Sequence, residues 1–442
     1  MLQTLVCPEF LFLAGTVQAL LPYLLWRLWG PNTAYDVRIT GLPVVIYVAG
    51  YASFLAGTRL VNRPRGQPQI LLSDVIHPVR LRRSALCLSA LGLFQAASIV
   101  RTYGHLPLIA FATGALDILE ANELLDETWI GQLALLQLTL CCLTMTALAE
   151  ILVVLHRTTG RLLSLPVVLP LATVAIAFTA GGKRQGLIMS IVSLLTGLAI
   201  HSPDCLKRIL HRLHARSTIA RFLTYAGIGV AVLVFFESIG RLRTGQGERG
   251  DFGEAVRYLE LPLINLEYQC ELAGFGPGDS CPRALCRNLL PRRAQLILPE
   301  SFVNYRPPPR LEPTSPTGFY GELHWYSGVL GVILFAFFAG MFSKLCYVNA
   351  NRSPFLFFCY CQLAWPLVAC HTYNHFLNLL YVPVPVFLCR VLASWLCVEE
   401  SPQSRDGAIL GFPGRLPGSV SCSGLARGAT AGIMGRKRPR AA

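Results

Sequence analysis

The chain has 442 residues, of which 53% are apolar and only 14% are charged, with a formal net charge of +14. A soluble globular protein carries about 25% charged residues, so this composition excludes an ordinary soluble protein and indicates an integral membrane protein. The positive charge is explained by basic loops that face anionic lipid, and nucleic acid is not an expected partner.

Apolar runs in chain order predict an all-α integral membrane protein. A helix that crosses the hydrocarbon core needs roughly 20 apolar residues, and about ten runs approach this length. They lie at 9–29, 42–60, 84–101, 129–155, 164–180, 186–201, 222–240, 323–348, 354–371 and 374–398. The fifth and sixth runs are separated by a Gly-Gly-Lys-Arg-Gln sequence at 181–185, which predicts a helical hairpin with a polar tip.

The basic residues of the loops predict the orientation. Alternate loops at 59–83, 156–163, 202–221 and 343–353 hold 15 Lys and Arg, and the intervening short loops at 27–41, 101–128, 181–186 and 371–375 hold 5. The positive-inside rule therefore places both termini in the cytoplasm. It places three segments outside: the long loop 241–321 between spans seven and eight, the Lys183-Arg184 tip and the acidic stretch 117–127.

The same pattern predicts the domain organisation. Residues 1–398 form a polytopic transmembrane domain that includes the large extracytoplasmic loop. Residues 399–442 are rich in Gly, Pro, Ser and Arg, which predicts a disordered cytoplasmic tail.

The large outer loop predicts an anionic ligand at the membrane surface. Residues 241–321 hold ten Arg and nine Asp or Glu, but no Lys. Arg presents a planar fork that grips phosphate or carboxylate bidentately and does not lose its proton. The loop begins with Arg241, Arg243 and Arg249 among glycines, a pattern that suits wrapping around an anion, with a gating or linker role as the alternative.

Two further parts of this loop carry expectations. Residues 258–268 are amphipathic and are predicted to pack on the membrane helices. At the end of the loop Glu322 and His324 meet Trp325 and Tyr326, and either polar side chain is suited to general-base work. The aromatic residues either belong to an interfacial belt or stack on sugar rings, and the polar pair either acts in catalysis or merely caps a span.

Cysteine usage predicts no metal site and leaves the pairing of the loop cysteines open. Of 15 Cys, most lie within apolar runs, where they are expected to be small buried side chains. Examples are Cys87, Cys141, Cys142, Cys370 and Cys389. No CxxC pair with metal-ligand spacing is present. Cys270, Cys281 and Cys286 lie in the outer loop, and three thiols cannot all pair within it.

The chain resembles the Wzy-type polymerases of oligosaccharide repeat units, often called O-antigen polymerases. The resemblance rests on the many-span layout, on the sequence 181–186 that opens a span, and on the single large outer loop late in the chain. It also rests on Pro-Thr-Gly-Phe-Tyr-Gly-Glu at 316–322, followed by Gly-Val-Leu-Gly-Val at 328–332. These features extend over roughly residues 80–400, although the family motifs are loose.

The resemblance implies a membrane-embedded glycosyltransferase. Such enzymes transfer a growing glycan from undecaprenyl diphosphate onto another lipid-linked repeat unit, at the outer face of the bacterial inner membrane. They are inverting enzymes that need neither a metal nor another cofactor. Their partners are the undecaprenyl-diphosphate-linked oligosaccharide, membrane lipid and a chain-length regulator protein.

The resemblance also suggests roles for individual residues. Arg184 matches the basic position that opens a span, and Arg249, with Arg243 beside it, matches the Arg-Gly region that starts the large loop. These arginines are expected to bind the diphosphate, with the neighbouring Lys183 and Arg241. The family pattern does not define the base, for which Glu322 is our first candidate and His324 the second.

Two other functions remain open on sequence grounds. An O-antigen ligase would share the layout and differ in its acceptor. A polytopic transporter or lipid-linked oligosaccharide flippase would also have many spans, but such proteins place charges at mid-membrane and show hydropathy repeats. Charges are sparse within the spans of this chain, and no repeat is evident.

Overall fold

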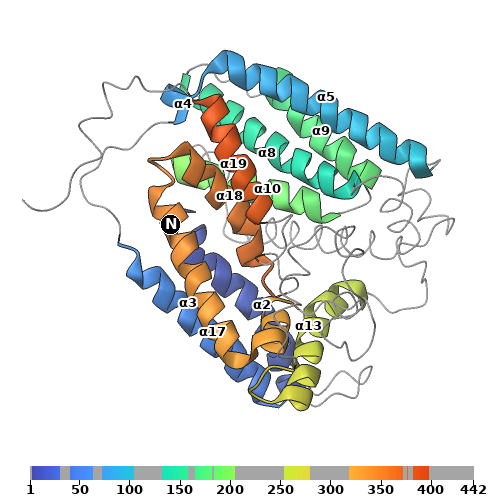
Figure 1. The fold of residues 1–442 in the computed structure, drawn as a ribbon, viewed down its shortest axis with the longest axis vertical. Helices are drawn as coiled ribbons and strands as arrows, with labels where there is room; N and C mark the ends of the chain where they lie inside the picture. Colours follow the sequence, from blue (N-terminus) through green and yellow to red (C-terminus); the bar gives the residue numbers. More distant parts are fainter. Residues whose placement is uncertain are drawn as a thin grey trace, which may run out of the picture. The chain divides into compact units, whose positions relative to one another are not determined.

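The described part of the chain is built from α-helices (Figure 1). A computed structural model describes residues 2–29, 40–62, 72–103, 132–157, 165–181, 184–204, 253–278, 318–371, 376 and 382–397. Across these ranges no β-strand forms, and a single antiparallel bridge joins Ile76 to Cys397. The helices are α1 (Leu2–Leu5), α2 (Pro8–Trp29), α3 (Leu42–Leu60), α4 (Leu72–Val75), α5 (Pro78–Tyr103), α8 (Gln132–Arg157), α9 (Leu165–Gly181), α10 (Arg184–His201), α13 (Gly253–Ala273), α17 (Gly318–Asn349), α18 (Pro354–Val368) and α19 (Pro383–Leu396).

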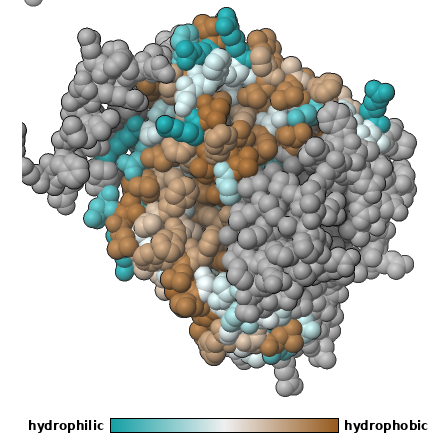
Figure 2. Space-filling view, in the orientation of Figure 1, coloured by the Kyte–Doolittle hydropathy of each residue, from teal (hydrophilic) through white to brown (hydrophobic). Residues whose placement is uncertain are grey.

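The apolar helices are those of an α-helical membrane protein. Four stretches are long and apolar enough to cross a membrane: Leu42–Leu60, Pro78–Thr102, Leu135–Leu155 and Gly318–Asn349. Large apolar side chains also face outward, and Phe94 and Leu330 are 68% and 67% exposed. Figure 2 shows hydrophobic side chains over much of the visible surface of the described helices. This is the surface expected of helices that face lipid.

Nine of the ten predicted runs coincide with helices of the described residues. Five of these helices contain shorter apolar segments, including Val167–Ala177 and Pro383–Leu396, so the predicted count of ten spans remains a prediction. The predicted hairpin at the Lys183-Arg184 tip is present as two consecutive helices, α9 and α10, which pack on each other. The run 222–240, the acidic stretch 117–127 and the tail 399–442 lie outside the described residues.

One boundary differs from the prediction. Helix α17 begins at Gly318 and not at 323, so Glu322, which was predicted to precede the span, lies inside the helix together with His324. Within the outer loop, α13 is a helix whose residues Leu261, Leu263, Ile264 and Leu266 are buried. Contacts of α13 with α2, α3 and α17 confirm the prediction that its amphipathic run packs on the membrane helices.

Helices α3 and α17 run side by side and make the most extensive contact of the described helices (Figure 1). Small residues allow the close approach, because a Cβ on Gly57 would overlap the Phe337 carbonyl and a Cβ on Gly340 would overlap that of Phe54. The Ser53 hydroxyl donates to the Ile333 carbonyl at 2.6 Å. Between lipid-facing helices there is little hydrophobic driving force, so such close packing supplies much of the association energy.

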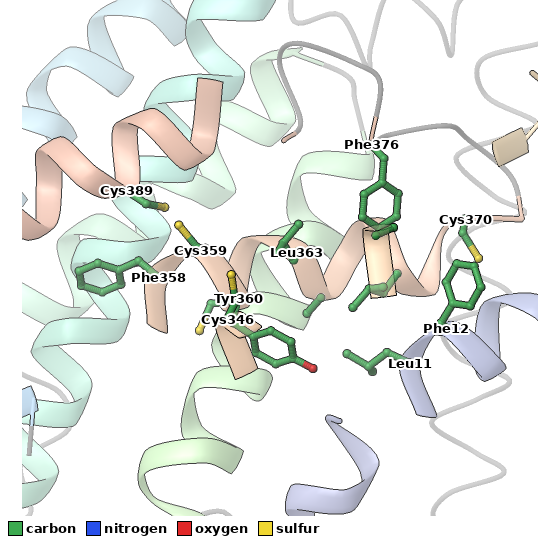
Figure 3. Close-up of a cluster of buried hydrophobic side chains, with 14 of the residues drawn as sticks. Leu11, Phe12, Cys346, Phe358, Cys359, Tyr360, Leu363, Cys370, Phe376 and Cys389 are labelled. Carbon is green, nitrogen blue, oxygen red and sulfur yellow. The ribbon is translucent and has the colours of Figure 1, made fainter. Parts of the chain in front are cut away.

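A large core joins these helices to α2, α18 and α19 (Figure 3). The Phe12 ring stacks on Phe54 with centroids 4.0 Å apart and lies edge-on to Phe319. Thiols fill space among these rings, and Cys359 and Cys389 point toward each other from α18 and α19. The expected burial is confirmed for Cys141, Cys370 and Cys389, whereas Cys142 is half-buried. The expectation for Cys87 is wrong, because this side chain lies on the exposed face of α5.

Polar side chains join helices within the apolar interior. Helices α5, α8 and α9 share a second, smaller core, and α8 also packs on α10. Thr144 of α8 and Ser190 of α10 share a hydrogen bond of 2.8 Å, and Ser193 donates to the Cys361 carbonyl at 2.9 Å. Hydrogen bonds of this kind between transmembrane helices each contribute about 0.6 kcal/mol on average.

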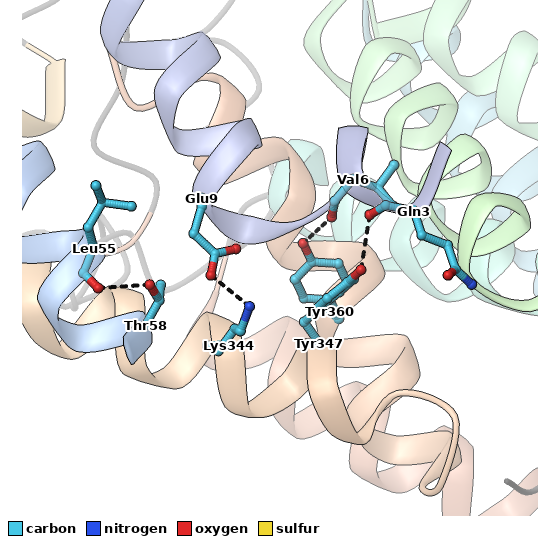
Figure 4. Close-up of polar contacts among 8 residues, drawn as sticks. All are labelled: Gln3, Val6, Glu9, Leu55, Thr58, Lys344, Tyr347 and Tyr360. Atoms are coloured by element: carbon cyan, nitrogen blue, oxygen red, sulfur yellow. Dashed lines mark hydrogen bonds and ion pairs between the residues drawn. The ribbon is translucent and has the colours of Figure 1, made fainter. Parts of the chain in front are cut away.

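Polar contacts join the end of α17 and the beginning of α18 to α1 and the beginning of α2. The Lys344 ammonium lies 2.6 Å from Glu9 Oε1, and the Tyr347 hydroxyl donates to the Gln3 carbonyl at 2.9 Å (Figure 4). Tyr360 donates to the Val6 carbonyl beside them. The end of α17 thus meets the beginning of α2. The cytoplasmic side expected for both ends remains a prediction.

We expect Gly340→Ala to destabilise the protein by about 1–3 kcal/mol, the usual cost of overpacking a close contact. The added methyl group would push against the Phe54 carbonyl and separate α3 from α17. Thermal unfolding in detergent micelles measures the effect. Gly41→Ala is the matched control, because a Cβ there meets nothing within 4 Å. Equal unfolding temperatures for the two variants would contradict the close packing.

Candidate functional site

The candidate site centres on a break in α17. At Gly328 the backbone has φ 64° and ψ −170°, a conformation essentially restricted to glycine. The break divides α17 into a short first limb, Gly318–Ser327, and a long second limb. The segment Gly274–Gly278, which follows α13, lies against this break. We call the two segments together the α13–α17 junction.

Backbone hydrogen bonds compensate for the break. The Val329 amide donates to the Phe275 carbonyl at 3.2 Å, and the Gly278 amide donates to the Trp325 carbonyl at 2.9 Å. There is no room for a side chain at Gly328, since a Cβ would lie 2.9 Å from the Phe275 oxygen. The junction thus pairs backbone groups that an intact helix would have paired internally.

Helix α13 ends in a conformation that presents a carbonyl group to α17. Gly274 has φ 59°, and its amide donates to the Cys270 carbonyl at 2.8 Å, as in a left-handed helix cap. The Gly274 carbonyl in turn lies 2.8 Å from His324 Nε2. A carbonyl oxygen only accepts, so His324 Nε2 carries the proton and donates it.

His324 is therefore held as one tautomer with its other nitrogen unprotonated. The side chain is fully buried, and Nδ1 has no hydrogen-bond partner among the described residues. A buried neutral imidazole whose proton is fixed on one nitrogen presents a lone pair at the other. This arrangement is chemically suited to accept a proton from a hydroxyl group.

Glu322 lies on the same limb but in a different setting. Its side chain is half-buried, whereas His324 is fully buried. Residues two apart point to different sides of a helix, so the limb does not place the two groups on one face. Trp325 lies against Gly278, where an added Cβ would overlap the indole ring. The chain therefore covers part of the ring surface that stacking on a sugar, one of the two predicted roles, would require.

A second polar group lies next to the junction and was not predicted. Tyr320 and Thr16 share a hydrogen bond of 3.0 Å, and Tyr47 lies 3.4 Å from His371 Nδ1. The rings of Tyr47 and Tyr320 are 4.3 Å apart between centroids. The Phe319 amide donates to the carbonyl of Cys370, the residue before His371, at 2.9 Å. Helices α2, α3 and α17 and the end of α18 thus meet around buried hydroxyl and imidazole groups.

Helix α13 also buries polar side chains, namely Asn265, Glu267 and Gln269. Glu267 Oε2 accepts from the Thr40 amide at 2.8 Å, which ties α13 to the start of α3. Both side-chain amide atoms of Gln269 are buried without a partner among the described residues. These three polar residues occupy alternate positions of an apolar run, and this pattern is the sequence signal that could have indicated buried polar side chains here.

The thiol of Cys270 has a packing role in α13. It is buried and free. Burial raises the pKa of this thiol to about 12, and the neighbouring carboxylates of Glu267 and Glu271 add to the rise. A thiol with such a pKa is protonated at neutral pH and is a poor nucleophile. Its predicted loop companions, Cys281 and Cys286, lie outside the described residues.

The predicted cationic residues are only partly described. Arg184 is the first residue of α10, the position expected for it, but the structure does not describe its side chain. Lys183, Arg241, Arg243 and Arg249 lie outside the described residues. Their convergence with Glu322 and His324 therefore remains a prediction. In the described ranges, no three His, Cys, Asp or Glu residues are grouped so as to hold a metal ion.

Comparison of the chain with protein-family models, curated proteins and solved structures gives no match. The class of protein follows from its own fold, which is that of an α-helical membrane protein. Within that class, the α13–α17 junction combines a broken helix with a buried imidazole, that of His324.

Replacement of Gly328 by Ala tests the junction. We expect Gly328→Ala to lose about 1–3 kcal/mol of stability, since a non-glycine residue is strained at this φ and ψ. Gly276→Ala is the control, because its Cβ would make only an ordinary contact of 3.6 Å with the Ala273 oxygen. Unfolding in detergent, followed by circular dichroism, compares the two. A Gly328→Ala protein as stable as the control would show that the break is not required.

Proposed function

We propose that the chain polymerises undecaprenyl-diphosphate-linked oligosaccharide repeat units at the outer face of the bacterial inner membrane. The product is an O-antigen, a capsule or an exopolysaccharide, made by metal-independent, inverting glycosyl transfer. The observation that carries the proposal is the state of His324, a buried imidazole whose Nε2–H is bound to Gly274 and whose Nδ1 has no partner among the described residues. This histidine lies two residues after the 316–322 motif by which the chain resembles the polymerases.

The acceptor sugar hydroxyl requires a base in this reaction. As the hydroxyl oxygen bonds to the anomeric carbon of the donor, the bond from that carbon to the diphosphate oxygen breaks and the hydroxyl proton passes to the base. His324 Nδ1 is suited to take that proton, and the Gly274 carbonyl would then stabilise the imidazolium through Nε2–H. Because its tautomer is fixed by the Gly274 carbonyl, we propose His324 before Glu322 as the base, which reverses the order preferred from the sequence alone.

The leaving diphosphate gains negative charge as the glycosidic bond breaks. Arg184, Arg243 and Arg249 are the residues proposed to bind it, together with Lys183 and Arg241. Each charge-assisted hydrogen bond contributes about 1.5–3 kcal/mol, so three well-placed contacts would accelerate the reaction by several orders of magnitude. Guanidinium groups would do this without a divalent cation.

Contacts within the described residues support the proposal that the starts of α3 and α17 and the ends of α13 and α18 lie on the same, outer side of the membrane. The Glu267–Thr40 bond, the His324–Gly274 bond and the Phe319–Cys370 bond join the starts of α3 and α17 to the ends of α13 and α18. The charges of the loops predict that all four helix ends lie outside, on the side of the membrane opposite to both termini. A site at the junction would therefore face the compartment in which lipid-linked repeat units are polymerised.

A transporter or lipid-linked oligosaccharide flippase is the second candidate, and one observation favours it. Transporters often bind substrate at discontinuous helices whose unwound backbone lines the site, and α17 is interrupted at Gly328. An O-antigen ligase also remains consistent with the same residues, because it differs only in its acceptor.

A gel ladder of surface polysaccharide tests the function. We expect a host that lacks the gene to carry a single repeat unit on its lipid A core and to regain long chains when the intact gene is restored. Core without any repeat unit would favour the ligase or the flippase. An unchanged ladder would exclude a role in O-antigen assembly.

Arginine variants in the same host test the diphosphate site. Arg249→Lys retains the charge but loses the bidentate fork, so the polymer should shorten greatly. Full-length polymer from both Arg249→Ala and Arg184→Ala, at normal protein level, would contradict the assignment.

The choice of base has its own test. In membrane vesicles supplied with lipid-linked repeat units, His324→Asn should slow polymerisation by about 10²–10⁴-fold, the usual contribution of a general base. Glu322→Gln should cost less. His77→Asn is the control, a partly buried histidine beside the end of α19, and should polymerise at the normal rate. A normal rate from His324→Asn, with the protein present at its usual level, would exclude His324 as the base.

A further inference from the structure

The beginning of α5 and the end of α19 form a corner of cationic and aromatic side chains. Arg80 Nη1 donates to the Trp395 carbonyl at 3.2 Å and to the Cys397 carbonyl at 3.4 Å, and its guanidinium lies 5.6 Å from the centre of the Trp395 ring. Trp395 Nε1 donates to Ser84 Oγ at 3.1 Å. These contacts hold Arg80 and Trp395 in place, although the Trp395 side chain remains 54% exposed.

Two further arginines extend this corner. Arg82 and Arg83 follow Arg80 in the first turns of α5, and both are exposed. Neither has an ion-pair partner among the described residues. Arg80 also retains free donors, because a guanidinium has five N–H groups and the two recorded bonds involve one nitrogen. The corner therefore offers one anion several donors that have no partner among the described residues.

An exposed apolar stripe runs along α5 from these arginines. Leu86, Leu93 and Phe94 are exposed and follow Arg82 and Arg83 at helical spacing. From Arg83 to Phe94 the helix rises about 17 Å, roughly half the 30 Å thickness of the hydrocarbon core. The stripe thus has the length of one leaflet, with cations at one end only.

Helix α19 contributes a matching stripe. Phe387, Val391 and Trp395 lie four residues apart and are 65%, 49% and 54% exposed. Contacts between α5 and α19, with Trp395 against Arg80, bring the ends of the two stripes to the same corner. Figure 2 shows hydrophilic side chains beside hydrophobic ones in the region where Figure 1 places α4 and the start of α5.

We propose that this corner binds an anionic phospholipid, independently of the enzymatic activity. The headgroup phosphate accepts hydrogen bonds from Arg82, Arg83 and the free donors of Arg80, and Arg suits this role because its fork binds phosphate bidentately. The Trp395 indole lies at the level of the headgroup, the usual depth of interfacial tryptophan. An acyl chain lies along the apolar stripe of α5. A free phosphate would satisfy the arginines but would leave the stripe without a role.

Native mass spectrometry with phosphatidylglycerol as the probe tests this site. The wild-type protein, in detergent, should bind one phosphatidylglycerol more tightly than phosphatidylcholine. The double variant Arg82→Gln/Arg83→Gln should bind it about 30-fold more weakly, as expected for the loss of two cations near an anionic headgroup. Arg59→Gln/Arg101→Gln is the matched control, because it removes two exposed arginines elsewhere and should leave binding unchanged.

A second variant keeps the test independent of the arginines. Phe94→Ala shortens the apolar stripe without changing charge, so it should weaken binding of long-chain phosphatidylglycerol and leave a short-chain analogue unaffected. Wild-type affinity in Arg82→Gln/Arg83→Gln, or an equal loss in the control pair, would overturn the site. Displacement of the lipid by glycerol phosphate at matched concentration, or no effect of Phe94→Ala, would show an anion site without lipid specificity and would also overturn the proposal.

Discussion

The need to satisfy backbone hydrogen bonds in an apolar environment governs the structure around α17. An unpaired backbone amide or carbonyl in a membrane costs several kcal/mol, so a helix can be interrupted there only where another segment supplies partners. At Gly328 that segment is Gly274–Gly278, which accepts from Val329 and donates to Trp325. The break, the course of the chain after α13 and the burial of α13 are therefore parts of one arrangement.

This arrangement has a chemical consequence for the first limb of α17. The carbonyl of Gly274, at the end of α13, binds the proton of His324 and thereby determines which imidazole nitrogen is free. The tautomer is set by a residue fifty positions away in the chain, through the left-handed cap of another helix. A buried imidazole whose tautomer is determined by a backbone carbonyl needs no neighbouring carboxylate to orient it.

The close packing of α3 on α17 supports the same region from the other side. Gly50 lies where a Cβ would meet the Tyr320 ring at 2.6 Å, so the small residues of α3 also make room for the tyrosine that binds Thr16. At the opposite ends of these helices, the Glu9–Lys344 ion pair and the carbonyl contacts of Tyr347 and Tyr360 hold α1, α2, α17 and α18 together. The bundle is therefore joined by polar contacts at both ends and by small residues between them.

The sequence by itself determined the helices, because the length and hydropathy of an apolar run are local properties that a bilayer selects directly. It also indicated the amphipathic character of 258–268 and the burial of Cys141, Cys370 and Cys389. It did not reveal that α17 begins at Gly318 and breaks at Gly328, since 38 glycines are present and only the partner segment distinguishes this one. Nor did it reveal that Cys87 faces outward, that Glu267 binds Thr40 or that His324 is buried, because each depends on which face of a helix another helix covers. Local chemistry decided which segments are helical, and only the tertiary contacts decided which polar groups are buried and which of their atoms remain available to react.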